Sequence, residues 1–343
     1  MTQCHAVRAA VARVAPLIHR TPTFTSSTAD AAAGLGRSVV FKAESLQKTG
    51  SFKIRGALNA MLQIPTNVRS AGAVTHSSGN HGQACAAAAA LVGLQMTVVL
   101  PHTVPSAKVD ACEAYGARVV LCEPNQSARL QGVANVVAET GATVVPPYDH
   151  MDVICGQATL GYELMEQHPE LDAIVVPTSG GGLLAGVAMG AQAVKPSVRV
   201  FAVEPLGKGL EGALRSGERT DARADEPVDT IADAIRTRPL GAIPWPIVRE
   251  LAERHVFEAS DAEITRGMRF AFERMKLVVE PAAACGVATV TEGHLAAHFD
   301  AEERAGAAAR VERVGVILCG GNVDIDALPW VSSEVRGPRR GTT

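Results

Sequence analysis

The sequence predicts an α/β protein of two domains, each built on an open, twisted and mostly parallel sheet that helices flank. Between residues 73 and 147, short runs of β-branched and apolar residues alternate with longer helical patterns, and the alternation resumes from about residue 156 to residue 318. Such alternation is typical of parallel sheets covered on both faces. Glycine-containing turns follow three of the strand-like runs, at the position where an open parallel sheet binds its ligands.

The first part of the chain is expected to begin with a helix at residues 3–18, where alanine, valine and leucine form one apolar stripe. A strand follows at residues 38–42. A second helix is expected from about Phe52 to Leu62, and Ser51 before it is a residue type that caps helix N-termini.

The middle of the chain alternates between strands and helices. The expected strands are 74–76, 96–100, 118–122 and 143–145, and the expected helices are 82–91, 106–115 and 127–140. Pro146-Pro147 is the expected crossing point between domains.

The second half continues this pattern. Helices are expected at 156–167, 183–194, 261–275 and 282–292, and strands at 173–176, 199–203 and 313–318. The polar stretch at about 207–227 is expected to be a loop with a helical piece.

Composition limits the functional classes. The 343 residues carry a net charge of −3, so no nucleic-acid partner is expected. The seven cysteines are scattered without a C-x-x-C pair, which argues against a zinc site or a disulfide framework. The N-terminus lacks a secretory apolar core, and the apolar run at 84–94 is too short to span a bilayer. A cytoplasmic protein without a membrane partner is therefore expected.

Lys53 is the first candidate for chemistry, because it lies between Phe52 and Ile54 at the expected start of a helix. Apolar neighbours can lower the pKa of an amine and make it a nucleophile or a Schiff-base former. Taken alone, the segment is better explained by an ordinary surface lysine. The three glycine-containing turns change that interpretation.

These turns read SSGNHGQ at 77–83, SGGGL at 179–183 and CGGN at 319–322. The second leads into a helix, and bare amides at a helix N-terminus bind phosphate well. The alternative is a dinucleotide site, because Gly180-x-Gly182-x-x-Ala185 fits the relaxed fingerprint and Glu204 follows about twenty residues later.

Together with SFKIRGA at 51–57, these turns resemble the serine/threonine dehydratase and serine racemase family. Its members are fold-type II pyridoxal-phosphate (PLP) enzymes with the tryptophan synthase β-like fold. The resemblance runs from about residue 5 to 330 in the family's order. It implies a large PLP-binding domain of residues 1–67 plus 150–330, a small mobile domain of residues 68–149, and a flexible tail of residues 331–343. A homodimer is also expected.

The resemblance also implies a role for each matching residue. Lys53 would hold PLP covalently and move the Cα proton, Phe52 would lie against the ring, Asn80 would bind the ring 3-oxygen, and Cys319 would face the ring nitrogen. The phosphate would be held by Ser179, Gly180, Gly181, Gly182 and Leu183, and the substrate carboxylate by Ser77, Ser78, Gly79, Asn80 and His81. Glu280 would tune proton transfer near the imine.

The implied activity is that of a PLP-dependent ammonia-lyase (dehydratase), which converts a β-hydroxy-α-amino acid to a 2-oxo acid and ammonia by β-elimination. The substrate would be of the L-serine or L-threonine type, or an aromatic one such as phenylserine. Several alternatives remain open. An amino-acid racemase on the same scaffold would use Ser78 opposite Lys53 as a second acid/base, whereas a β-replacement enzyme, a nicotinamide-dependent dehydrogenase and a non-catalytic amino-acid sensor are more remote.

One segment departs from the family. Relatives that bind a divalent cation carry a final carboxylate where this chain has Leu210, and Lys208 stands in the same segment. No bound metal is therefore expected. The hypothesis is that the Lys208 ammonium, paired with Glu204, takes the place of the cation.

Overall fold

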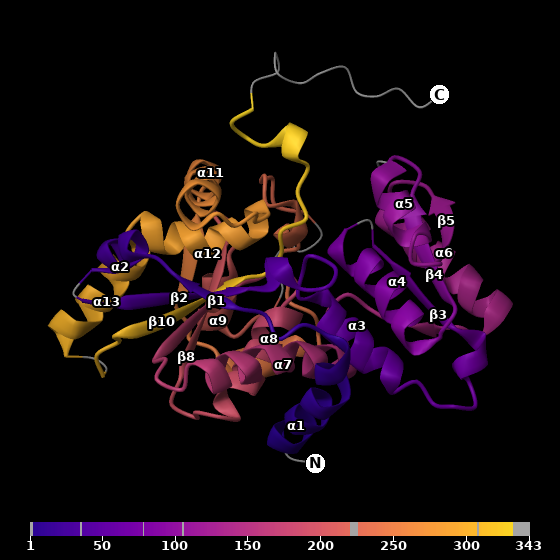
Figure 1. The fold of residues 1–343 in the computed structure, drawn as a ribbon, viewed down its shortest axis with the longest axis horizontal. Coiled ribbons are helices and arrows are strands. Elements are labelled where there is room, and N and C mark those ends of the chain that lie inside the picture. Colours follow the sequence, from indigo (N-terminus) through magenta and orange to yellow (C-terminus); the bar gives the residue numbers. More distant parts are fainter. Residues whose placement is uncertain are drawn as a thin grey trace.

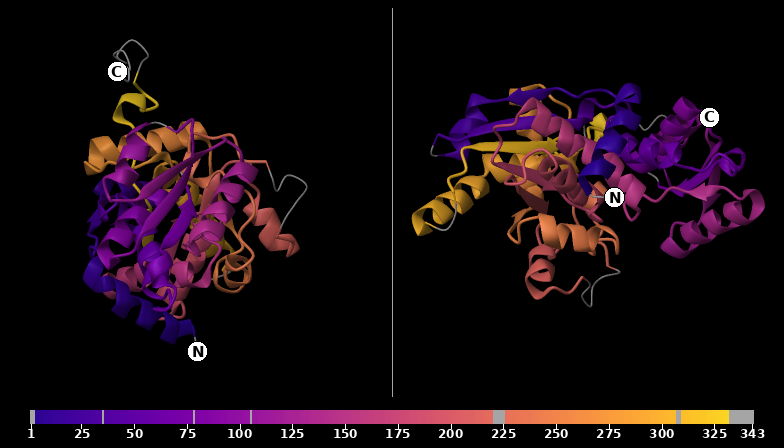
Figure 2. Two further views of the ribbon diagram at one scale, coloured as in Figure 1. Left: turned by 90° about the vertical axis from the view of Figure 1, so that its right-hand side faces the viewer. Right: turned by 90° about the horizontal axis from the view of Figure 1, so that it is seen from below.

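The computed structural model describes residues 3–34, 36–77, 79–104, 106–219, 226–306 and 309–331. Figure 1 shows a larger domain around one long sheet and a smaller domain beside it that contains α4 (Asn80–Val92). In the right view of Figure 2 the smaller domain lies at one side of the larger one, and in the left view it lies in front of it. The predicted α/β class with two mostly parallel sheets is confirmed. The predicted tail lies outside the described residues, apart from Val331.

The larger domain is built on a six-stranded sheet. Its strands, in spatial order, are β1 (Thr23–Thr25), β2 (Ser38–Ala43), β10 (Arg313–Leu318), β7 (Ala173–Pro177), β8 (Arg199–Pro205) and β9 (Val256–Ala259). β1 runs antiparallel to β2, and the other neighbours are parallel. β7 is buried along its whole length, as expected of a central strand with helices on both faces.

Helices cover both faces of this sheet (Figure 1). One group packs together below it: α1 (Gln3–Val14), α7 (Met151–Gln167), α8 (Gly182–Gln192) and α10 (Pro244–Leu251). The opposite group is α2 (Ser27–Ala33), α11 (Asp261–Phe270), α12 (Pro281–Thr291) and α13 (His294–Ala305). α9 (Leu210–Ser216) follows β8. Short 3-10 turns lie at Ala15–Leu17, Glu44–Leu46, Arg69–Ala71, Asp233–Ile235 and Ile325–Ala327.

The smaller domain has a four-stranded parallel sheet in the order β5 (Arg118–Cys122), β4 (Met96–Pro101), β3 (Ala73–His76) and β6 (Thr143–Val144). Its helices are α4, α5 (Ser106–Glu113) and α6 (Gln126–Thr140). α3 (Lys53–Leu62) packs against both α4 and α7, so it joins the two domains. Buried Ile54, Leu58 and Met61 on α3 belong to one apolar cluster with the alanines of α4.

The strands and helices expected from the sequence are present, with ends shifted by a few residues. The helix expected from residue 156 begins earlier, at Met151. The sequence patterns did not predict β1, α2, α10, β9 or α13. Of the helices in the described ranges, none combines the length and the hydropathy that a bilayer span requires.

Two local expectations are wrong. Ser51 does not cap α3: Phe52 holds the cap position without a side-chain hydrogen bond, because Ser51 is held in a backbone bridge to Gly320. The helix expected at 261–275 is α-helical only to Phe270. It continues as a π-helical turn over Ala271–Met275 and stops at Lys276, whose φ is 60°.

Candidate active site

Distant parts of the chain meet beside Lys53. Ser51 forms an isolated antiparallel bridge with Gly320, and the Phe52 N–H donates to the Cys319 carbonyl over 3.0 Å. The N-terminus of α3 is thereby fixed at the carboxyl end of the central strand β10. This is the edge at which open parallel sheets bind ligands.

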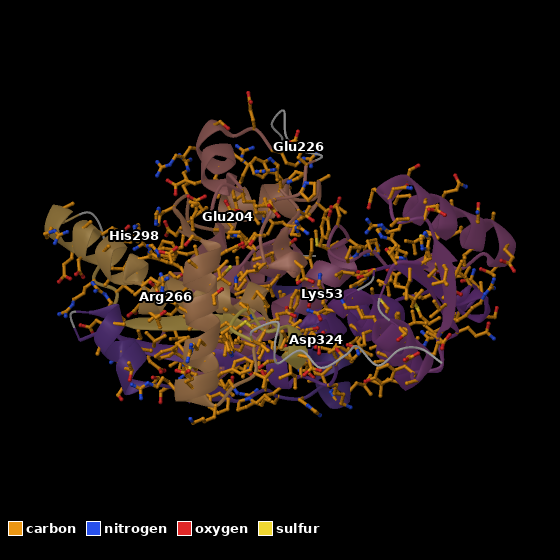
Figure 3. All side chains as sticks on the ribbon, turned by 90° about the horizontal axis from the view of Figure 1, so that it is seen from above. Lys53, Glu204, Glu226, Arg266, His298 and Asp324 are labelled. Atoms are coloured by element: carbon orange, nitrogen blue, oxygen red, sulfur yellow. The ribbon has the colours of Figure 1, made fainter. Side chains whose placement is uncertain are left out.

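Lys53 is the first residue of α3 and is only partly accessible to solvent. Figure 3 shows it between the larger and the smaller domain. Its Nζ donates to the Pro147 carbonyl over 2.8 Å and lies 5.0 Å from the centre of the Phe52 ring. Loss of hydration lowers the pKa of the Lys53 amine to about 8. A large share of the amine is then neutral and nucleophilic near pH 8.

A carboxyl group and two amides form a hydrogen-bonded chain next to it. Asn80 Nδ2 lies 3.0 and 2.9 Å from the two Glu280 oxygens, and Asn322 Nδ2 donates to Asn80 Oδ1 over 2.8 Å. Burial raises the pKa of Glu280 to about 7. Cys319 Sγ lies 3.9 Å from Glu280, and burial raises the pKa of this thiol, which therefore stays neutral. The two partners fix the orientation of the Asn80 amide.

The glycine loop runs between β7 and α8 and contains the five residues expected to bind phosphate, which are Ser179, Gly180, Gly181, Gly182 and Leu183. Gly181 has a φ of 90° and is the N-cap of α8, a conformation that favours glycine. A Cβ on Gly180 would lie 2.5 Å from the Tyr148 ring, and one on Gly182 would lie 3.0 Å from the Tyr148 backbone. The loop therefore approaches Tyr148 more closely than a side chain permits.

The turn expected to bind the substrate carboxylate precedes and begins α4. Gly79 N–H donates to Ser77 Oγ over 3.3 Å, and Ser78 lies outside the described residues. The buried His81 ring contacts the Val145 carbonyl through Nε2 at 2.9 Å. Loss of hydration lowers the pKa of His81 to about 3, so the ring is neutral and holds α4 to the end of β6.

Glu204 and Lys208 form a buried ion pair, with Nζ 3.6 Å from Glu204 Oε2; Figure 3 labels Glu204. Glu204 Oε1 accepts the N–H groups of Gly209 and Leu210, and the side chain is fully buried, so it is not exposed to a ribose as the dinucleotide alternative requires. Across the described ranges, no cluster of three or more His, Cys, Asp or Glu residues could hold a metal ion.

Sequence reasoning missed the contribution of Tyr148, Pro147 and Asn322. Pro147 and Tyr148 lie in the crossing segment after β6, and they meet Lys53 and the glycine loop only through the fold. Asn322 was part of a recognised segment, but its role became visible only through its bonds to Asn80 and to the Thr49 carbonyl. The one feature of the sequence that pointed to this segment was Pro146-Pro147, the expected crossing point between the domains.

The residues present fit PLP. The Lys53 amine is suited to a covalent bond with its aldehyde, and the glycine loop presents unhindered amides at a helix N-terminus for its phosphate. Phe52 and Asn80 would contact the ring, and the neutral Cys319 thiol would lie at its nitrogen. These groups together are those of an enzyme that works through a phosphorylated aldehyde coenzyme.

Comparisons with known proteins agree with that class. The family model described as "Pyridoxal-phosphate dependent enzyme" matches residues 14–320, and the chain belongs to this family. The predicted fold type and the predicted cofactor, PLP, are confirmed.

Three relatives show how this family divides. Serine racemase of Oryza sativa subsp. indica is 39% identical over 328 residues, which cover 96% of this chain and 93% of the relative. The crystal structure of a PLP-dependent aspartate racemase matches with a TM-score of 0.85 and 43% identity, covering 95% of this chain and 97% of that one. The crystal structure of the T.th. threonine deaminase matches with a TM-score of 0.81 and 36% identity, covering 93% and 98%.

Proposed function

We propose that the protein is a PLP-dependent amino-acid racemase that acts on a small polar substrate of the serine or aspartate type. The observation that carries this proposal is the similarity to racemases. The chain is 39% identical to a serine racemase and 43% identical to an aspartate racemase over nearly its whole length. The expectation from sequence put the ammonia-lyase first and the racemase second. The comparisons favour the reverse order.

Racemisation requires that a proton leave Cα on one face and return on the other. When bound, PLP withdraws electrons from Cα and makes this proton acidic. The Lys53 amine, with its lowered pKa, is the base on one face. Ser78, which lies two residues before Asn80 in the sequence, is the proposed acid/base on the opposite face.

The neighbouring groups would bind and orient the substrate. The main-chain amides of the turn at residues 77–81 are the proposed site of its carboxylate, together with the Ser77 hydroxyl. Glu280, with a pKa near neutrality, would hold or release a proton next to Asn80. Closure of the smaller domain over this site would exclude water from the exchanging proton.

The test is the fate of each enantiomer of serine and of aspartate in D2O, followed by chiral chromatography and mass spectrometry. The wild-type protein should convert either enantiomer to the racemic mixture and place deuterium at Cα. Ser78→Ala should lose interconversion but keep exchange at Cα of one enantiomer, because Lys53 remains. Ser127→Ala, an exposed serine on α6, is the matched control and should still interconvert the enantiomers. Undiminished interconversion by Ser78→Ala would refute the two-base assignment.

A second candidate is β-elimination from serine or threonine to a 2-oxo acid and ammonia. The similarity to the threonine deaminase favours it, and a β-hydroxyl can leave from the same activated substrate. Release of the 2-oxo acid in the serine incubation, and in a parallel incubation with threonine, measures it. Release from serine that outpaces the interconversion of both serine and aspartate would make the ammonia-lyase the principal activity.

A further inference from the structure

Lys208 lies where lysine is rarely found. It stands in the tight turn between β8 and α9 and is 2% exposed, although lysine is among the residue types least often buried. Gly207 and Gly209 on either side have φ values of 80° and 95°. These two left-handed residues let the backbone reverse, so that the side chain between them is directed into the protein.

The ammonium group of Lys208 is surrounded by oxygen atoms. Its Nζ donates to the Thr178 carbonyl over 2.5 Å and to the Ser179 carbonyl over 3.3 Å, and it lies 3.6 Å from Glu204 Oε2. Two carbonyls and a carboxylate are the kind of ligands that a hard metal cation takes in proteins.

The two carbonyls belong to the residues that open the glycine loop. In a planar trans peptide, the C=O and the following N–H point in opposite directions. The Thr178 and Ser179 carbonyls point at Lys208, so the N–H groups of Ser179 and Gly180 point away from it. Those N–H groups belong to the loop that is expected to hold the phosphate.

We propose that Lys208 is a built-in cation that positions the glycine loop, with its amides turned outward to bind the phosphate of PLP. The role is one of positioning, since Lys208 contacts loop carbonyls. It does not depend on whether the bound coenzyme serves racemisation or elimination.

The alternative is that Lys208 is an ordinary buried ion pair that contributes to stability alone. Lys42 offers a matched comparison, because it is also fully buried and donates to a carbonyl, that of Thr21, and to a carboxylate, that of Glu163. Its contacts involve no residue of the glycine loop. If both lysines contribute to stability alone, then replacing either one should have the same effect on the affinity for PLP.

The first experiment compares Lys208→Met with Lys42→Met. Apoenzyme is titrated with PLP to obtain Kd, and the phosphorus resonance of the bound coenzyme is recorded. Lys208→Met should raise Kd by about tenfold or more and shift the resonance, because charge-assisted bonds that orient the loop are lost. Lys42→Met should leave Kd within about twofold. A Kd within twofold for Lys208→Met, or equal increases for both variants, would overturn the proposal.

The second experiment uses Lys208→Ala, which leaves space among the three oxygen ligands. The melting temperature of the apoenzyme and the Kd for PLP are measured in ammonium chloride and in tetramethylammonium chloride at equal ionic strength. Ammonium fits the space, so it should raise the melting temperature of this variant and recover PLP affinity, with no such difference in the wild type. Equal behaviour in both salts, including failure to fold in both, would count against a cation role.

Discussion

Two ionisable side chains at the site, Lys53 and Glu280, have pKa values displaced toward neutrality because they have lost water. The sequence predicted both residues and the apolar neighbours of Lys53. It could not predict that the pKa of Glu280 is raised, because the burial that causes this shift arises only when distant segments pack around the carboxyl group. Residue roles that depend on neighbours distant in the sequence therefore needed the structure.

Glu280→Gln should change how stability depends on pH. The folded-state pKa of about 7 lies above the ordinary value of 4.5, so between these values the folded protein binds more protons than the unfolded chain. Wild-type stability attributable to this group is therefore highest below pH 4.5 and falls as the pH rises to 7. The loss is at most on the order of 3 kcal/mol.

The measurement is urea unfolding of the apoenzyme at several pH values from 5 to 8. The Glu280→Gln protein should gain stability relative to the wild type as the pH rises. Glu166→Gln changes an exposed carboxylate and serves as the control. A constant difference between Glu280→Gln and the wild type over this range would contradict the assigned pKa.

At the scale of elements, the position of the glycine loop could be predicted from the sequence, whereas its close contact with Tyr148 could not. Three adjacent glycines between an expected strand and an expected helix predicted a phosphate-binding turn from the sequence. Why Gly180 and Gly182 must be glycine became clear only from Tyr148, which comes from the segment after β6. Periodic elements were predictable, whereas short pieces such as β1 and β9 obtain their conformation from sheet pairing.

Alanine substitutions should distinguish the close approach of Gly180 to the Tyr148 ring from that of Gly182 to the Tyr148 backbone. Gly180→Ala should weaken PLP binding about tenfold, because its Cβ would meet the Tyr148 ring. Tyr148→Ala in the same chain should relieve that loss. Tyr148→Ala should not relieve the loss of PLP affinity caused by Gly182→Ala. The Cβ added at residue 182 would meet the backbone and Cβ of residue 148, which alanine retains.

PLP titration of the single and double variants gives the coupling between the two positions. Gly212→Ala on α9 is the control, since its added Cβ would meet no atom within 4 Å. Additive effects of Gly180→Ala and Tyr148→Ala would show that the close approach of the Tyr148 ring does not limit the loop.

A buried charge cluster holds α3 in place behind Lys53. Arg55 donates to both oxygens of Glu44 at 2.8 and 2.7 Å and to Glu163 at 3.0 Å. Arg55→Met would leave two buried carboxylates with Lys42 as their remaining cation partner, and should cost about 3–5 kcal/mol of unfolding free energy. Arg20→Met removes an exposed pair with Glu166 and should cost under about 1 kcal/mol.

Urea unfolding of the two variants measures both free energies under the same conditions. Similar values for Arg55→Met and Arg20→Met would show that the cluster does not anchor α3.

At the scale of the whole molecule, we propose that residues 68–149 move as a unit against residues 1–67 and 150–330. The chain passes between the two sheets after α3 and again before α7, and Asn80 bonds to Glu280 and Asn322 across the boundary. These boundaries are the ones that the family resemblance implied, and Pro146-Pro147 marked the second crossing in the sequence. The expected homodimer also stays a prediction, which light scattering would test.

Hydrogen exchange of the holoenzyme with and without 2-methylserine tests this motion. The analogue lacks a Cα proton, so it should bind and close the smaller domain without reacting. Amides at the start of α4 and in the segments at residues 63–72 and 145–150 should become more protected, while those of β10 should not change. Equal protection with and without the analogue would argue for a rigid molecule.

The place of β10 has a consequence for how the protein is made. This strand, encoded at residues 313–318, lies between β2 and β7, and the Ser51 bridge needs Gly320. A ribosome must therefore synthesise the chain as far as Gly320 before the larger sheet and the Ser51 bridge can form. Nascent chains that end before β10 should be unable to capture the coenzyme.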